Sequence, residues 1–135
     1  MQQNGEPHAE TLNPRVIVAD ARISLGYMHS GNPIMGPIDA SVKIALNEAR
    51  LRQDGTWGHF HEIGHNHQHG DWTFDGMGGV TNNLIVLTNF DEVLGLRFDS
   101  GHENIRDRDL RNRRIREFMG KGSPFQEWKS DPSSP

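Results

Sequence analysis

Three residues in one short segment have the types and the spacing of a metal site. His61 and His65 are four residues apart and enclose Glu62 in the pattern His-Glu-x-x-His. On a helix this spacing puts both imidazoles on one face, where they can reach one zinc ion, with Glu62 about 100° round from His61. Zinc would lower the pKa of its water to about 7, and Glu62 could accept the proton and pass it to a leaving amine. The pattern therefore predicts metal-assisted amide hydrolysis.

Composition narrows the choice of metal ligands and partners. The chain has 135 residues, eight histidines and no cysteine, so a metal must be bound by His, Asp or Glu. The net charge of -4, with acids and bases interleaved, argues against binding to nucleic acid or a membrane surface by charge alone. The N-terminus lacks the apolar core of a secretory signal, and no apolar stretch is long enough to span a bilayer.

The elements that must position the motif follow from periodicity and from breaking residues. Residues 16–18 and 23–25 have the β-branched and alternating character of short strands, and the Gly and Pro steps over 31–37 predict a loop. Apolar spacing and caps predict helices over 38–51, 56–67, 80–94 and 105–119, with a short fifth starting at 123–126. Strands followed by helices predict an α+β domain.

The boundaries of that domain follow from the polar ends of the chain. Residues 1–13 are polar and irregular, and residues 130–135 are rich in Ser and Pro, so both ends are expected to be disordered. Residues 14–129 are then expected to form one domain, or part of one.

The surroundings of the motif resemble the enhancin-like, mucin-degrading metallopeptidase family. The active-site helix of that family reads much like residues 57–68, from Trp57-Gly58 through His61-Glu62-Ile63-Gly64-His65-Asn66-His67-Gln68. Further similar blocks occur in the family's order, at 18–20, 23–24, 26–31, 33–35, 70–74, 80–83 and 124–129. The resemblance covers nearly all of residues 14–132.

This resemblance implies a zincin fold of the gluzincin type with one catalytic Zn²⁺, held by His61 and His65, and Glu62 as the general base. It also implies hydrolysis of O-glycosylated, mucin-like glycoproteins by a secreted or cell-surface protein. Family members are much larger, so the chain resembles the core of such a domain or a truncated relative.

One position departs from the family's pattern. The family's third zinc ligand is a glutamate on the next helix, just before Val-Thr, and this chain has Gly79 there. A catalytic zinc normally has three protein ligands and a water. Asp71 lies six residues after His65, as a metzincin's third ligand does, but Gln68 replaces the glycine that the metzincin turn requires. Other possible donors are His69, Asp75 and Glu92.

Two other groups of polar residues have simpler explanations. His59 and His67 lie about 200° round the helix from His61 and His65, so we expect them to pack or to support the ligands. Six arginines between 106 and 116 alternate with acidic residues at helical pairing distances, which predicts a solvated, self-paired helix face.

Three functions are therefore consistent with the sequence. The first is a zinc metallopeptidase. The second is a catalytically inactive zincin-like domain that binds glycopeptides without cutting them. The third, which the residues favour least, is an RNA-binding domain that uses the arginine-rich helix and binds in a salt-dependent way.

Overall fold

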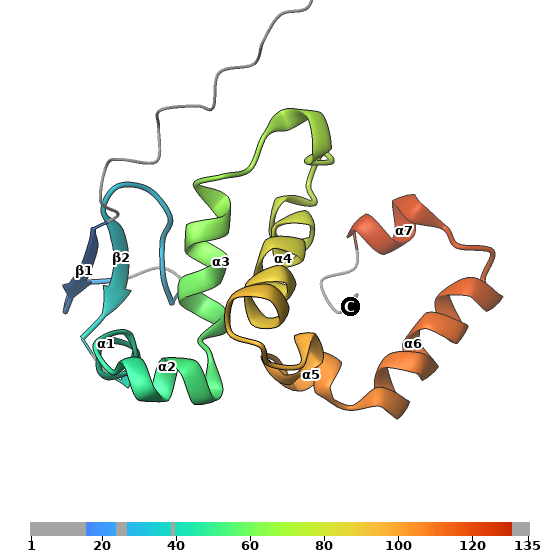
Figure 1. Ribbon diagram of the computed structural model, residues 1–135. Coiled ribbons are helices and arrows are strands. Elements are labelled where there is room, and N and C mark those ends of the chain that lie inside the picture. Colours follow the sequence, from blue (N-terminus) through green and yellow to red (C-terminus); the bar gives the residue numbers. More distant parts are fainter. Residues whose placement is uncertain (1–15, 24–26, 39, 131–135) are drawn as a thin grey trace, which may run out of the picture.

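The computed structural model describes residues 16–23, 27–38 and 40–130. In these residues two strands come first and seven α-helices follow, so the predicted α+β order is confirmed. The small sheet lies at one side of the molecule, the helices α3 and α4 lie in the middle, and α5, α6 and α7 form an arm on the other side (Figure 1).

The sheet consists of β1 (Ile17–Asp20) and β2 (Ile34–Pro37), which pair in parallel with Ile17 opposite Ile34. The predicted loop over residues 31–37 is therefore wrong in its second half. The side chain of Ile34 is completely buried, and this burial outweighs the glycine and proline punctuation around it. Ile23 is outside either strand, contrary to prediction, and residues 24–26 lie outside the described part of the chain.

The helix predicted over residues 38–51 is two helices, α1 (Ala40–Ala45) and α2 (Glu48–Asp54). Asn47 separates them, because its side chain accepts a hydrogen bond of 3.0 Å from the backbone N–H of Arg50 and caps α2. Gly55 ends α2 with a φ of 64°, a conformation that favours glycine.

The central pair consists of α3 (Trp57–His65) and α4 (Gly78–Thr88), which pack directly against each other. The 3-10 turn η2 (Gly70–Trp72) lies in the connection between them, and α4 continues into a π-helical turn, η3 (Asn89–Val93). Phe90 in this turn is fully buried, with its ring 6.2 Å from Trp57 and 5.6 Å from Phe60. This aromatic cluster holds the C-terminal end of α4 to the N-terminal end of α3.

The helix predicted over residues 105–119 is also interrupted. After the 3-10 turn η4 (Phe98–Ser100), the chain forms α5 (Glu103–Arg106) and α6 (Arg108–Gly120). Asp107 separates α5 from α6 because its carboxylate accepts two backbone N–H bonds of 3.0 Å, from Asp109 and Leu110. The short α7 (Phe125–Ser130) follows as predicted.

The expected pairing of charges along α6 is wrong. In the described ranges no ion pair joins its arginines to Glu103, Asp107, Asp109 or Glu117. Arg111 pairs instead with the buried Asp99 of η4 at 3.2 Å, and Arg106 donates to the carbonyl of Ser100. The carboxylate of Asp107 is used in capping, which removes one of the expected partners.

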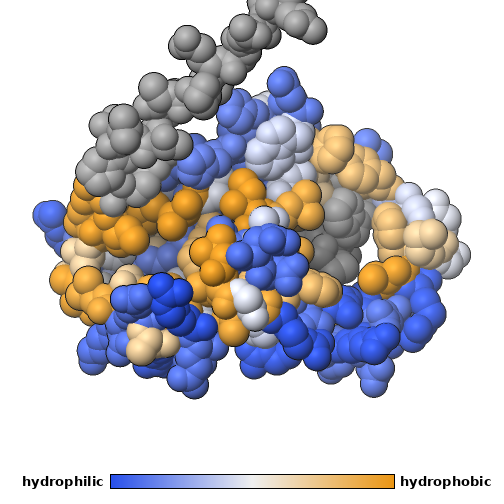
Figure 2. Space-filling view, in the orientation of Figure 1, coloured by the Kyte–Doolittle hydropathy of each residue, from blue (hydrophilic) through white to orange (hydrophobic). Residues whose placement is uncertain are grey.

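Apolar and polar residues gather on different parts of the surface. Figure 2 shows hydrophobic side chains over the sheet and the middle of the molecule, and hydrophilic ones along the edge formed by α2, α5 and α6. Exposed apolar side chains include Ile17, Ile38 and Leu84. None of the helices within the described residues has the length and apolar character needed to cross a membrane.

Candidate metal centre

The structure brings the two histidines of the motif together on α3. Their Nε2 atoms are 3.1 Å apart, and the two rings are perpendicular, with centroids 4.6 Å apart. Two Zn–N bonds of about 2.05 Å at a tetrahedral angle would separate the nitrogens by about 3.3 Å. The pair therefore has the spacing of two adjacent ligands of one zinc ion.

The tautomer of His65 follows from its hydrogen bonds. Its Nδ1 lies 2.6 Å from Oε1 of Gln68. The amide nitrogen of Gln68 donates to the carbonyl of Gly78 at 2.6 Å and to the hydroxyl of Thr81 at 2.9 Å. Because the carbonyl can only accept, the amide oxygen must face His65, and Nδ1 of His65 must donate. This leaves Nε2 of His65 with its lone pair toward His61.

His61 is held in the same way by α4. Its Nδ1 lies 2.9 Å from Oδ1 of Asn83, an oxygen that can only accept, so Nδ1 donates and Nε2 faces Nε2 of His65. Burial lowers the pKa of His61, the hydrogen bond with Asn83 acts against this, and the nearby His65 lowers the pKa further. A neutral imidazole whose N–H is fixed by an oxygen acceptor is the usual form of a histidine metal ligand.

Glu62 is partly buried beside His61. It makes no hydrogen bond or ion pair within the described residues, and its charge acts to raise the pKa of His61. Its carboxylate is therefore available to accept a proton, as the predicted role requires.

A third ligand is the part that the described residues lack. A Cβ atom built on Gly79 would lie 4.0 Å from Cε1 of His61, with no closer neighbour, so α4 turns this position toward the histidine pair. Among the residues described, no three His, Cys, Asp or Glu side chains are placed to hold a metal ion. The four substitutes considered from the sequence are all exposed and do not complete the site: His69, Asp71, Asp75 and Glu92.

The fit to zinc is therefore partial. His61 and His65 suit two coordination positions, and their Nδ1 partners support that use. A catalytic zinc with three protein ligands does not fit the residues described, because the position facing His61 has no side chain.

Of the two neighbouring histidines, His59 packs as expected, whereas the expectation for His67 is wrong because α3 ends at His65. His59 is buried, and its Nδ1 lies 2.9 Å from the hydroxyl of Thr56, the residue that precedes α3. Burial lowers the pKa of His59. His67 is exposed beyond the end of α3. Neither belongs to the histidine pair.

Sequence reasoning missed the three amides that fix this centre, Gln68, Asn82 and Asn83. Asn82 is fully buried, and its Nδ2 donates to the carbonyl of His61 at 2.6 Å. Its Oδ1 has no hydrogen-bond partner in the part of the chain that the structure describes, and it lies where a side chain on Gly64 would collide with it. The available signal was the Asn82-Asn83 pair directly before the apolar residues 84–87, because buried amides need partners.

Comparison with known proteins gives two results. A family model described as peptidase M60, enhancin and enhancin-like matches residues 2–133. Relatives include TRPM8 channel-associated factor 2 of Homo sapiens, 42% identical over 116 residues, and TRPM8 channel-associated factor 3 of Rattus norvegicus, 40% identical over 116 residues. Each alignment covers 85% of this chain and 12% of the relative, so the chain spans about an eighth of the length of these proteins. No solved structure gives a significant match.

Proposed function

Because the chain belongs to the enhancin and enhancin-like family of M60 peptidases, we propose that it is a zincin-like domain that binds polypeptides without cutting them. In this proposal the domain retains the paired histidines of a peptidase but has lost the third metal ligand. It would serve as a binding part of a longer protein.

The observation that carries this proposal is the position of Gly79. The Cβ atom of a glutamate at this position would lie 4.0 Å from Cε1 of His61, which is van der Waals contact. Glycine leaves this space without a carboxylate. Two imidazoles alone hold zinc weakly and leave the bound water poorly oriented. Without a fixed water, Glu62 has no nucleophile to activate.

The names of the relatives support binding as the retained activity. Proteins named channel-associated factors are described by what they associate with, not by a reaction. We infer that the partner of this domain is a polypeptide segment of a membrane or cell-surface protein, and that O-glycosylated segments are the first to test. The rest of a longer protein would add contacts that this domain lacks.

A second candidate is an active zinc peptidase, and one observation favours it. His61 and His65 both donate from Nδ1 to amide oxygens, and their Nε2 atoms are 3.1 Å apart, as in a zinc chelate. Activity would then need a third ligand from a partner or from sequence outside the described ranges. When bound, zinc would supply Lewis acidity at this pair, and Glu62 would hold the proton.

The two candidates differ in a joint zinc and peptide experiment. Zinc is titrated into the 135-residue chain by calorimetry, and an O-glycosylated peptide is then assayed for binding and, by mass spectrometry, for cleavage. We expect weak zinc binding, no cleavage, and peptide binding that Glu62→Gln leaves unchanged.

Glu117→Gln is the matched control, since Glu117 is an exposed carboxylate on α6. Tight stoichiometric zinc with cleavage that only Glu62→Gln abolishes would establish the peptidase instead. A chain that neither binds nor cleaves the peptide would contradict the glycopeptide-binding function.

A further inference from the structure

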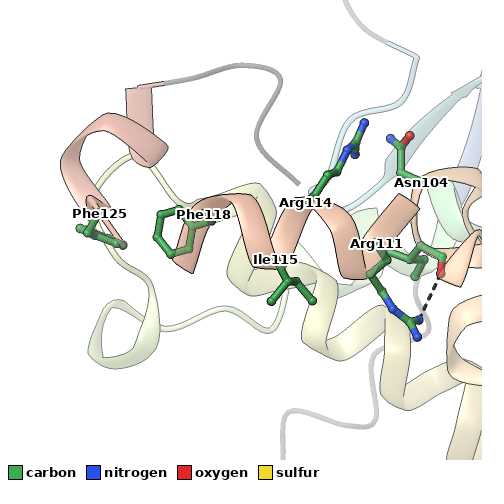
Figure 3. Close-up of a pocket in the computed structure, with 7 residues that line it drawn as sticks. Asn104, Arg111, Arg114, Ile115, Phe118 and Phe125 are labelled. Atoms are coloured by element: carbon green, nitrogen blue, oxygen red, sulfur yellow. Dashed lines mark hydrogen bonds between the residues drawn. The ribbon is translucent and has the colours of Figure 1, made fainter. Parts of the chain in front are cut away.

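An apolar pocket lies along α6, on the opposite side of α4 from the sheet, and plays no part in the metal centre. Its volume is about 360 Å³, and its wall is almost entirely apolar. Figure 3 shows Phe118 and Phe125 at one end and Arg111 toward the other end, with Ile115 and Arg114 between them on opposite sides of α6. A pocket of this size and composition is in the range that binds small molecules.

The pocket is elongated along the helix. Arg111 and Phe118 both line it and are about two turns apart, which corresponds to about 10 Å along α6. Ile105 of α5 and Phe125 of α7 contribute from the two neighbouring helices. This shape suits an extended apolar chain better than a compact group.

The two arginines that line the pocket, Arg111 and Arg114, differ in their hydrogen bonds and ion pairs. Arg111 donates to Asp99 at 3.2 Å and to the carbonyl of Ile105 at 3.1 Å, so its charge is engaged within the fold. Arg114 is partly buried and has neither a hydrogen bond nor an ion pair to any residue that the structure describes. Among the described residues, Arg114 is therefore the one arginine of the pocket wall whose charge is not engaged.

We propose that this pocket binds a small amphiphile with an apolar chain and a single carboxylate, such as a medium-chain fatty acid. The chain would lie against Ile115, Phe118 and Phe125, and burial of its methylenes would supply most of the affinity. The guanidinium of Arg114 would bind the head group, because its planar fork matches the two oxygens of a carboxylate.

The concave apolar wall, and the single cation that is unpaired within the described ranges, decide between this ligand and larger partners. A membrane surface or an acidic helix would use several cations on a convex face. Arg113 and Arg116 are on the same helix but outside the pocket wall, and both are exposed. An apolar pocket whose wall holds one cation left unpaired by the residues that the structure describes instead matches a ligand with one tail and one charge.

The test uses decanoate as the probe and the full 135-residue chain. Calorimetry and NMR shifts of Ile115 and Phe118 are followed during titration below the micelle concentration. We expect saturable one-to-one binding, weaker binding of decanol and decylamine, and a loss of about fourfold per methylene removed on going to octanoate and hexanoate.

Variants on α6 separate recognition from general charge attraction. Arg114→Gln should weaken decanoate binding about tenfold or more, since it removes a charge-assisted bond, and should leave decanol binding unchanged. Arg113→Gln is the matched control because it removes an equal charge next to the pocket, and we expect little effect. Ile115→Gln should weaken both decanoate and decanol.

Three results would overturn the proposal. They are the absence of saturable decanoate binding, equal binding of decanol and decanoate, and equal losses in the Arg114→Gln and Arg113→Gln chains. None of them depends on zinc or on peptide binding at the histidine pair, so this proposal and the proposed function can fail separately.

Discussion

The α3–α4 pair and the corner between η4 and α6 are held by different forces. Between α3 and α4, side-chain amides make the connections: the buried Asn82 donates to the carbonyl of His61, and the partly buried Gln68, just after α3, bonds to both His65 and Gly78. At the corner, the carboxylate of Asp99 accepts hydrogen bonds from the guanidinium groups of Arg97 at 2.9 Å and Arg111 at 3.2 Å.

The amides between α3 and α4 therefore fix the separation of the two helices, whereas the ion pairs at the corner hold η4 and α6 together with a looser geometry. A buried amide allows a narrow range of helix separations, because its lost hydrogen bonds with water are not replaced if the helices move. The Arg97 side chain is 79% exposed, so it can follow Asp99 through several conformations at little cost. Precise placement of metal ligands is therefore expected between α3 and α4, and a looser geometry is expected at the corner between η4 and α6.

The largest effect is expected on zinc affinity, from a substitution at Gly79 beside the histidine pair. Gly79→Glu places a carboxylate opposite His61 and His65 and should tighten zinc binding by more than about 100-fold. Loss of a residue that only supports a metal ligand costs up to about 100-fold in affinity, and a direct ligand should contribute more than that. Zinc titration by calorimetry with a competing chelator measures the change.

Gly78→Glu is the control for this substitution. Gly78 is on the same helix, and a Cβ there would meet nothing within 4 Å. Both variants gain helix propensity, worth about 0.5–1 kcal/mol, and both add a negative charge at the N-terminus of α4. Equal zinc affinity in the two chains would mean that Gly79 does not face the site, or that another residue already supplies the third ligand.

The next effect concerns the close approach of α3 to α4. Gly64→Ala puts a methyl group against Oδ1 of Asn82, a fully buried side chain whose amide nitrogen is held by its hydrogen bond to the carbonyl of His61. We expect a net loss of about 1–3 kcal/mol in the free energy of unfolding, despite the better helix propensity of alanine. Urea denaturation measures this loss.

A second substitution tests the cause. Asn82→Ala alone leaves the carbonyl of His61 without its donor and should also destabilise the chain. In Gly64→Ala/Asn82→Ala the two losses should not add, because the new methyl group fills part of the space of the removed amide. Strictly additive losses would contradict a collision at this point.

The sequence predicted contacts between neighbours on one helix better than contacts between different elements. The spacing of His61 and His65 predicted that their rings would meet, since a helix fixes neighbours four residues apart. The family resemblance predicted that Gly79 would face them, and the structure agrees. The polar pair Asn82-Asn83 indicates that these amides need partners, but the sequence does not say that both partners are atoms of His61, or that the amide nitrogen of Gln68 donates to α4.

Helix boundaries failed where one polar residue outweighed an apolar pattern. Asn47 and Asp107 each interrupt a helix that periodicity predicts as continuous, and each does so by capping the next one. The strand β2 was missed because its pairing with β1 is a non-local contact. The predicted ion pairs of α6 failed because Asp99, outside that helix, competes for Arg111.

Acid should weaken the α3 region before it weakens the corner. Burial lowers the pKa of His59 and of His61, so the unfolded chain binds more protons than the folded chain near their usual value of about 6.5. The stabilising contribution is complete above that pH and is lost as the pH falls below it. In metal-free buffer the melting temperature should be lower at pH 5.5 than at pH 7.5.

Two histidine variants test this prediction through the slope of the melting temperature against pH. His59→Gln removes one of the two buried titrating groups and should flatten the dependence of the melting temperature on pH. His67→Gln, at an exposed position, should leave the slope as it is. An unchanged slope in the His59→Gln chain would show that this histidine does not couple folding to pH.

The smallest effect is expected at the corner. Hydrogen bonds from Arg97, and also from Arg111, lower the pKa of Asp99, so its stabilising contribution is present above the usual aspartate pKa of about 3.9 and is lost as the pH falls below it. Asp99→Asn at pH 7 keeps the size of the side chain and removes its charge. The loss of stability should be smaller than that of Gly64→Ala.

Salt distinguishes this charge effect from a packing effect. Interactions of the partly exposed arginines with Asp99 are screened by salt, because the Debye length falls from about 10 Å at 0.1 M to about 3 Å at 1 M. The stability difference between the original chain and Asp99→Asn should therefore shrink in 1 M NaCl, whereas that of Gly64→Ala should persist. Asp91→Asn, at an exposed site on η3, is the control and should have little effect at either salt concentration. A salt-independent loss at Asp99 as large as that at Gly64 would mean that the corner is as rigidly specified as the α3–α4 interface, and the contrast between the two regions would not hold.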